Sequence, residues 1–279
     1  MIQNGGVNHG ITAINILSGG TVIFNDNSIV DGGSGNTGIA VNDGGSLIFY
    51  SCHIANCSAG VIARGNSSIS FGDYNNGRSS EFWNNSTAIF FENYTGTTYF
   101  NQLNIKIRNN GNGIEFISGS GTVNISNVSI YSNSQSGIVS TNGNINITGG
   151  SIYSNSYGIY QRNCNLNIGG GAIFSNNYGI CLENGYSGKM TITNTYIHSN
   201  NYYAIVHYQN SDGSCTILGG LIYGKIYLGQ NDNYVNTDSN YTRFEVTPST
   251  YYFKRKLVKT SSNAHANNEI VRVTMTENR

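Results

Sequence analysis

The residues that could perform acid–base chemistry are few and far apart in this sequence. Nine carboxylates precede residue 220, namely Asp26, Asp31, Asp43, Asp73, Glu81, Glu92, Glu115, Glu183 and Asp212. A glycoside hydrolase needs two carboxylates facing one bond, and a calcium site needs several oxygen ligands together. The spacing brings no such group to one place, so it predicts no catalytic residue, no metal site and no cofactor.

Two places come nearest to a catalytic arrangement: Glu115, and a long turn that contains Asp73, Arg78 and Glu81. A long turn can extend over a groove and build a site. A polysaccharide lyase or glycoside hydrolase with its site near residues 73–92 is therefore the alternative hypothesis. We favour a protein that is not an enzyme, because isolated turn charges are usually solvated. The five cysteines and five histidines lack metal-ligand spacing, which favours buried thiols.

Aromatic residues recur at one place in the pattern and form a candidate binding surface. They are Trp83, Tyr131, Tyr153, Phe174, His198 and Tyr223. In stacked segments these rings would form a stripe on the solvent face, about 4.8 Å apart. The stripe has two interpretations. It stabilises neighbouring segments, or it offers an apolar surface to a glycan or a partner protein.

A second outward column is largely apolar. It consists of Ala40, Ile62, Phe90, Glu115, Val139, Tyr160, Cys181 and Val206. Large exposed apolar patches are unusual on a monomer. We therefore expect the tail, a loop or another subunit to cover this column.

These residues are positioned by a repeat of short strands. Aliphatic anchors recur 21 to 28 residues apart, at Ile11, Ile39, Val61, Ile89, Ile114, Ile138, Ile159, Ile180 and Ile205. Three strands per period and no helical periodicity predict an all-β fold, a right-handed-type parallel β-helix of about nine coils. We assign residues 1–224 to the β-helix and residues 225–279 to a β-rich cap or exit segment. That segment has strand character at Thr242–Val246, Tyr251–Val258 and Glu269–Met275.

Asparagine recurs three residues after the anchor of the third strand. The positions are Asn85, Asn110, Asn133, Asn155, Asn176 and Asn200, with Gly32 and Cys57 as exceptions. Asparagine tolerates the left-handed backbone of a tight turn, and stacked amides can bond from coil to coil. The column predicts a buried structural ladder.

Stretches such as GIYQRNCNLNIGGGAIFSNNYGI resemble the pectate-lyase-like superfamily of right-handed parallel β-helices, including bacterial surface and secreted repeat proteins. The resemblance covers about residues 8 to 224. It implies the fold but not one activity, because this fold hosts lyases, hydrolases, phage tailspikes, adhesins and inert stalks. It also implies an extracellular or cell-surface location, bacterial or phage-like, although the sequence begins without a signal peptide.

Composition narrows the partners further. The chain has 10% charged residues, a formal net charge of +0 and one proline, which disfavours disorder and nucleic-acid binding. No apolar run is long enough to span a membrane. The remaining partners are a glycan, a protein surface or a second copy of the chain. Unpaired strands at the solenoid ends would favour self-association, unless the tail strand Glu269–Met275 folds back as a cap.

Overall fold

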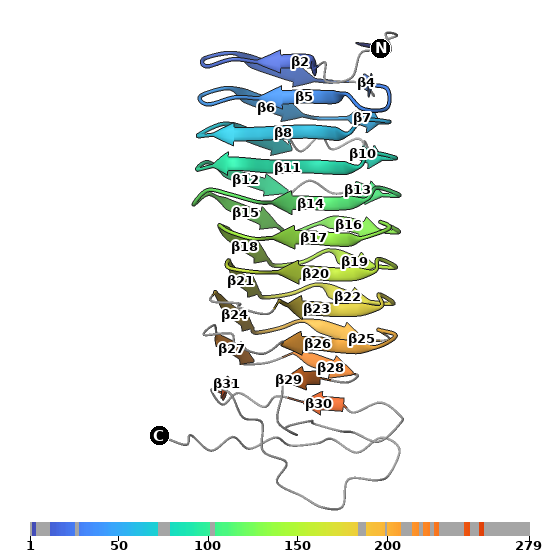
Figure 1. Ribbon diagram of the computed structural model, residues 1–279, viewed down its shortest axis with the longest axis vertical. Helices are drawn as coiled ribbons and strands as arrows, with labels where there is room; N and C mark the ends of the chain where they lie inside the picture. The colour runs from blue at the N-terminus through green and yellow to red at the C-terminus, as the bar shows by residue number, and fades with distance from the viewer. Residues whose placement is uncertain are drawn as a thin grey trace, which may run out of the picture.

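The structure, a computed structural model, describes residues 2–3, 12–25, 28–71, 79–100, 104–183, 188–198, 200–207, 214–217, 220–223, 226–228, 243–245 and 251–253. Its strands stack in one column from the N-terminal to the C-terminal coils (Figure 1). Every regular element in this part of the chain is a β-strand, and the described residues include no helix able to cross a membrane.

Three sheets run along the column. Sheet A has eleven strands: β1 (Ile2–Gln3), β4 (Ser28–Asp31), β7 (Cys52–Ala55), β10 (Ser80–Trp83), β13 (Ile105–Arg108), β16 (Val128–Tyr131), β19 (Ser151–Tyr153), β22 (Ala172–Phe174), β25 (Tyr196–His198), β28 (Leu221–Tyr223) and β30 (Arg243–Glu245). Sheet B has ten: β2 (Thr12–Ile16), β5 (Thr37–Val41), β8 (Ala59–Gly65), β11 (Thr87–Tyr94), β14 (Asn112–Phe116), β17 (Ser136–Ser140), β20 (Tyr157–Gln161), β23 (Tyr178–Leu182), β26 (Tyr203–His207) and β29 (Ile226–Leu228). Sheet C also has ten: β3 (Thr21–Phe24), β6 (Ser46–Phe49), β9 (Ser68–Phe71), β12 (Thr97–Phe100), β15 (Thr122–Ile125), β18 (Asn144–Ile147), β21 (Asn165–Ile168), β24 (Lys189–Ile192), β27 (Ser214–Ile217) and β31 (Tyr251–Phe253).

The predicted parallel β-helix is confirmed. Each coil contributes one strand to sheets B, C and A in turn, and strands of successive coils pair in parallel from β1 to β29. The predicted count of about nine coils is slightly off. The sheets of ten and eleven strands include the parallel end strands β1 and β29 and the antiparallel strands β30 and β31. The first anchor was also misplaced. Ile14, and not Ile11, pairs with Ile39.

The interior is one continuous hydrophobic core, and its composition changes along the axis. At the last position of the sheet C strands, Phe24, Phe49, Phe71 and Phe100 give way to Ile125, Ile147, Ile168 and Ile192. The phenylalanine rings stack, with centroids 5.2 Å apart for Phe49 and Phe71 and 4.8 Å for Phe71 and Phe100. In-register parallel strands produce such columns because like positions repeat at the coil spacing.

Steric crowding explains why the residue before each sheet B anchor is small. A Cβ on Gly158 would lie 2.5 Å from the Gly179 carbonyl oxygen and 2.9 Å from the Ile173 Cγ2 atom. The Gly113 and Gly137 sites are similarly tight. The recurring small-then-aliphatic pair therefore marks where the start of each sheet B strand passes close to the backbone of the next coil.

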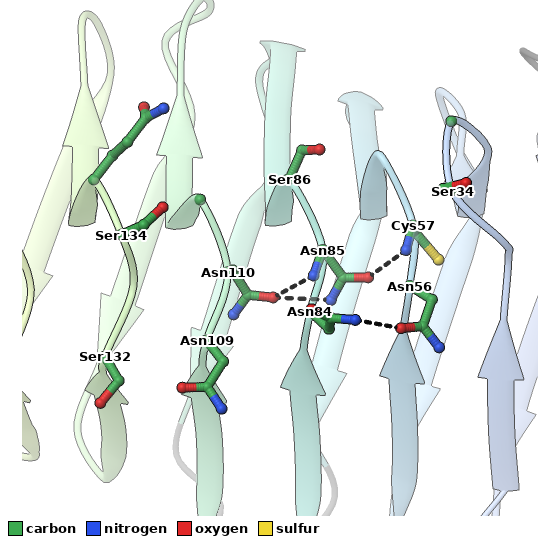
Figure 2. Close-up of a pocket in the computed structure, with 13 residues that line it drawn as sticks. Ser34, Asn56, Cys57, Asn84, Asn85, Ser86, Asn109, Asn110, Ser132 and Ser134 are labelled. Atoms are coloured by element: carbon green, nitrogen blue, oxygen red, sulfur yellow. Dashed lines mark hydrogen bonds between the residues drawn. The ribbon is translucent and has the colours of Figure 1, made fainter.

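The asparagine ladder is confirmed in the hydrogen bonds. Asn155 Nδ2 donates to Asn176 Oδ1 of the next coil at 3.0 Å, and Asn155 Oδ1 accepts from the backbone N–H and side-chain amide of Asn133 at 3.0 and 2.9 Å. Figure 2 shows the start of the ladder, where the Cys57 backbone N–H donates to Asn85 Oδ1 at 3.0 Å. Five ladder residues are buried, and Asn200 at the C-terminal end is half-buried.

The left-handed backbone expected at the ladder asparagines was predicted one residue too late. The left-handed backbone belongs to the preceding position, which is occupied by Asn56, Asn84, Asn109, Ser132, Ser154 and Ser175, all with φ between 53° and 59°. The ladder residues are selected instead by hydrogen bonding, because a buried amide must satisfy its donors and its acceptor.

Strands from the C-terminal segment form the last strand in two of the three sheets. β30 pairs antiparallel with β28 in sheet A, and β31 pairs antiparallel with β27 in sheet C. These strands fall within the predicted Thr242–Val246 and Tyr251–Val258, whereas Glu269–Met275 lies outside the described residues. In sheet B, β29 still pairs in parallel with β26, so parallel stacking continues past residue 224.

Candidate functional site

The turns that lead from sheet A into sheet B stack along one edge of the solenoid, here called the A–B edge. They span residues 32–36, 56–58, 84–86, 109–111, 132–135, 154–156 and 175–177, and a further turn joins β25 to β26. The ladder lies beneath this edge, with its amides engaged between coils. The surface of the edge is therefore supported by a fixed floor.

A shallow groove of about 560 Å³ lies along the N-terminal part of the A–B edge. It is lined by Ser34, Gly35, Asn56, Cys57, Asn84, Asn85, Ser86, Asn109, Asn110, Gly111, Ser132, Ser134 and Gln135 (Figure 2). Asn84 Nδ2 donates to Asn56 Oδ1 at 2.6 Å, and Asn56 Nδ2 donates to Asp31 Oδ2 at 3.1 Å. The groove is uncharged along its lining, and sequence reasoning did not find it.

The predicted aromatic column exists in the C-terminal coils, on the sheet A side of the A–B edge. Tyr131, Tyr153, Phe174 and His198 stack with centroids 4.9 to 5.0 Å apart and interplanar angles of 3° to 6°. The faces between successive rings are thus covered, so along its length the column presents ring edges and not the flat faces that a sugar ring would stack on.

The N-terminal end of this column differs from the prediction. Arg108 occupies the position between Trp83 and Tyr131, and its guanidinium lies 5.8 Å from the centroid of the Trp83 ring. Trp83 is therefore separated from the stacked rings. The backbone of Tyr223 belongs to β28, but its side chain lies outside the described residues.

A second aromatic cluster lies on the sheet B side of the same edge. Tyr157 and Tyr178 stack at 5.0 Å, Tyr178 contacts Tyr202 and Tyr203, and Tyr160 packs edge-on against Tyr157 at 5.3 Å. We did not predict this cluster. The signal was present, because an aromatic residue stands on both sides of the ladder asparagine in YSNSY, FSNNY and HSNNYY.

Burial changes the ionisation of several of these rings. Desolvation raises the pKa of Tyr153, Tyr157 and Tyr160, and Glu183 adds to the effect at Tyr160. Desolvation also lowers the pKa of His198. The phenols therefore stay protonated, and His198 favours its neutral form.

The apolar column on sheet B is partly buried by neighbouring side chains of the described coils. The expected cover by the tail, a loop or another subunit stays a prediction. Ala40, Cys181 and Val206 are buried, and Ile62, Phe90, Glu115, Val139 and Tyr160 are half-buried. Cys181 lies beside Tyr160 in register, and the tyrosine cluster surrounds this part of the column. The column does not form a continuous exposed apolar face within the described coils.

The carboxylates considered for catalysis are held separately. Glu81 pairs with Arg108 and lies 3.8 Å from His53 Nδ1, while Glu92 pairs with Arg64 at 2.7 Å. Glu115 Oε2 accepts hydrogen bonds from Thr87 at 3.0 Å and Asn112 at 3.1 Å. Asp73 and Arg78 lie outside the described residues.

The cysteines are buried thiols in the part of the chain that the structure describes. Cys52, Cys57, Cys164 and Cys181 form no disulfide bond, and burial raises their pKa values to about 12, 11, 11 and 12. A protonated, buried thiol is a poor nucleophile and a poor metal ligand. Across the same described coils, no three His, Cys, Asp or Glu side chains are grouped to hold a metal ion.

Comparison with known proteins supports the fold and supplies no activity. No curated protein and no solved structure gave a significant match. A family model described as "Right handed beta helix region" matches residues 87–241, which is more than half of the chain. The stacked parallel coils and this match together show that the chain belongs to the right-handed β-helix family.

Proposed function

We propose that this chain is a noncatalytic structural or adhesive module that acts outside the cell. Its aromatic surfaces at the A–B edge contact a partner protein or a glycan. The observation that carries the proposal is the pair of aromatic surfaces that flank this edge in the C-terminal coils. Clustered aromatic side chains with polar tips are enriched at binding surfaces.

The ring geometry sets the kind of contact. Because the faces of Tyr131, Tyr153 and Phe174 are used in mutual stacking, a partner reaches ring edges and phenol hydroxyls. The rings are already ordered by their neighbours, so binding costs little side-chain entropy. The amide and hydroxyl groups of the turns between the two aromatic surfaces add hydrogen bonds.

The proposal of a noncatalytic role rests on the carboxylates. Glu81, Glu92 and Glu183 are each paired with an arginine. The Glu81 pair lies on sheet A, whereas the Glu92 and Glu183 pairs lie at the end of sheet B in coils far apart along the axis, so no two of these carboxylates face each other. A general acid needs a partner carboxylate across the bond to be cleaved. The extracellular location rests on the resemblance to surface and secreted β-helix proteins. Protease treatment of intact cells or particles, followed by immunodetection, tests it.

Retention assays test the binding role. The purified chain is passed over insoluble polysaccharides and cell-surface protein fractions, and the Tyr131→Phe/Tyr153→Phe variant is compared with the wild type. The variant keeps the stacked rings and removes two hydroxyls, so we expect an unchanged Tm and roughly tenfold weaker retention, the effect of about two hydrogen bonds.

Tyr99→Phe is the matched control, because Tyr99 is 53% exposed on sheet C, away from the edge. Equal retention of the column variant and the wild type would contradict the binding role. Release of oligosaccharide products from any of the polysaccharides would contradict the noncatalytic assignment.

A further inference from the structure

The groove on the N-terminal part of the A–B edge owes its shape to turn lengths. Turns 56–58, 84–86 and 109–111 have three residues each, whereas the turns on either side, 32–36 and 132–135, have five and four. The three short turns form the floor, and the two longer turns close the ends. With about 4.8 Å per coil, the depression extends roughly 19 Å along the solenoid axis.

The chemistry of the lining is uniform. Its thirteen residues are Asn, Gln, Ser, Gly and Cys, with no charged and no aromatic side chain among them. An anionic ligand would meet no cation here, and an apolar ligand would bury unsatisfied amides. Carboxamide and hydroxyl groups both donate and accept hydrogen bonds, which suits a ligand made of neutral hydroxyl groups.

Several groove side chains are available to a ligand. Within the described chain, Ser86, Asn109, Ser132, Ser134 and Gln135 are exposed and make no side-chain hydrogen bond. The floor beneath them is rigid, because Asn85 and Asn110 are bonded to their neighbouring coils. Free donors and acceptors above a fixed floor, repeated at each coil, favour an extended ligand lying along the axis.

The backbone of the turns disfavours an extended peptide. The N–H groups of Asn84, Asn109 and Ser132 donate to the carbonyls of Asn109, Tyr131 and Tyr153 in the following coil. Because these main-chain groups are occupied, the groove offers no free strand edge for β-augmentation. It also lacks the apolar pockets that anchor peptide side chains.

We propose that this groove binds a neutral oligosaccharide of a few residues along the solenoid axis. The inference goes beyond the proposed function, because it adds a second contact surface with its own ligand class. It places a ligand site on the N-terminal coils, separate from the aromatic surfaces of the C-terminal coils. Its failure can therefore be distinguished from failure of the adhesive role.

Saturation-transfer NMR and titration of the full chain test the proposal. The probes are cellohexaose, mannohexaose and chitohexaose, with an oligogalacturonate hexamer and a Ser/Asn-rich decapeptide as the alternative ligands. The groove variant is Asn109→Gly/Gln135→Ala. Glycine retains the left-handed backbone at residue 109, where φ is 55°. Gln135→Ala alone provides a second variant on a normal backbone. Asn167→Ala, an exposed amide on sheet C, is the matched control.

We expect at least one neutral hexasaccharide to bind, with roughly tenfold loss in the double variant, a smaller loss in Gln135→Ala and no loss in Asn167→Ala. Binding of no neutral hexasaccharide, or equal loss in Asn167→Ala, overturns the proposal. Preference for the oligogalacturonate or the peptide also overturns it. The adhesive role is judged separately, by the Tyr131→Phe/Tyr153→Phe variant.

Discussion

The N-terminal and C-terminal coils stack aromatic side chains in opposite places, with the change falling between Phe116 and Tyr131. Up to Phe116 the stacked rings lie inside, where Phe24, Phe49, Phe71 and Phe100 form a column in the core. From Tyr131 onward the described core is aliphatic, and the stacked rings lie on the outer faces of sheets A and B. In-register parallel strands stack like side chains on either face, so the same scaffold can be stabilised from inside or from outside.

The outer surfaces of the two regions differ in a complementary way. The N-terminal coils carry ion pairs such as Arg108 with Glu81 and a neutral polar groove at the A–B edge. The C-terminal coils carry aromatic rings on both sides of that edge. The ladder runs through both regions. The comparison thus separates what every coil needs from what each region presents to a partner.

The largest expected effect comes from removing an interior ring. Phe49 is fully buried and contacts Phe24, Phe71 and Phe82. Phe49→Ala should lower the free energy of unfolding by about 3–5 kcal/mol, because it removes apolar contacts and leaves a cavity. Phe174→Ala removes the same side chain from an outer column and should cost only about 1 kcal/mol. Denaturant unfolding of both variants checks this, and equal losses would refute the inside–outside comparison.

The next largest effect should come from the tight glycine before a sheet B anchor. Gly158→Ala places a methyl group 2.5 Å from the Gly179 carbonyl oxygen, so overpacking should cost about 1–3 kcal/mol. At Gly169 the nearest atom to such a methyl group is 3.5 Å away, and Gly169→Ala should change stability by less than about 0.5 kcal/mol. Thermal unfolding of the two variants measures the difference. Indistinguishable Tm values would show that close contact with the backbone of the next coil is not what selects glycine.

The buried ladder asparagines should contribute more to the free energy of unfolding than the asparagines that bond between coils on the outer face. Asn155→Ala leaves buried partners in Asn133 and Asn176 unsatisfied and should cost about 1–3 kcal/mol. Asn146 also bonds between coils, to Asn124 Oδ1 at 2.9 Å, but water can replace that bond. We expect Asn146→Ala to cost less than about 0.5 kcal/mol. A Tm for Asn155→Ala equal to that of the wild type would argue against a structural ladder.

The smallest effect concerns pH and distinguishes the outer aromatic column. Desolvation holds the pKa of His198 below its ordinary value of 6.5. Between the two pKa values the unfolded chain binds more protons than the folded chain. Stability should therefore fall as the pH decreases through 6.5, and this decrease should level off below the folded pKa. Melting curves from pH 7.5 to 5 test this.

His198→Phe keeps a ring against Phe174 and removes the titrating group, so part of the pH dependence should disappear. His53→Phe, in the N-terminal coils, is the comparison and should keep the contribution of His198. An unchanged pH profile in His198→Phe would exclude this histidine as a source of the effect.

Much of the fold could be read from the sequence, because its signals are local and repeated. The spacing of anchors such as Ile39 and Val61 identified the strands, and the asparagine column identified the turns. The start of the repeat was missed by three residues, since a small residue followed by an aliphatic one also occurs at Gly10-Ile11. The left-handed residue was missed by one position, because asparagine at the ladder has a hydrogen-bonding role that sequence does not distinguish from a conformational one.

The candidate site depended more on tertiary structure. The sequence predicted that Tyr131, Tyr153 and Phe174 would align, but only the structure placed their faces against each other. The tyrosines of sheet B join the same edge because each lies just beyond a three- or four-residue turn. The sequence by itself determined the coil, its core and its ladder, since these follow from residue type at a fixed period. Only the tertiary structure decided the groove, the ring orientations and the antiparallel strands at the end of two sheets. These features depend on how turns and strands from distant parts of the chain stack on one another, which no local sequence pattern specifies.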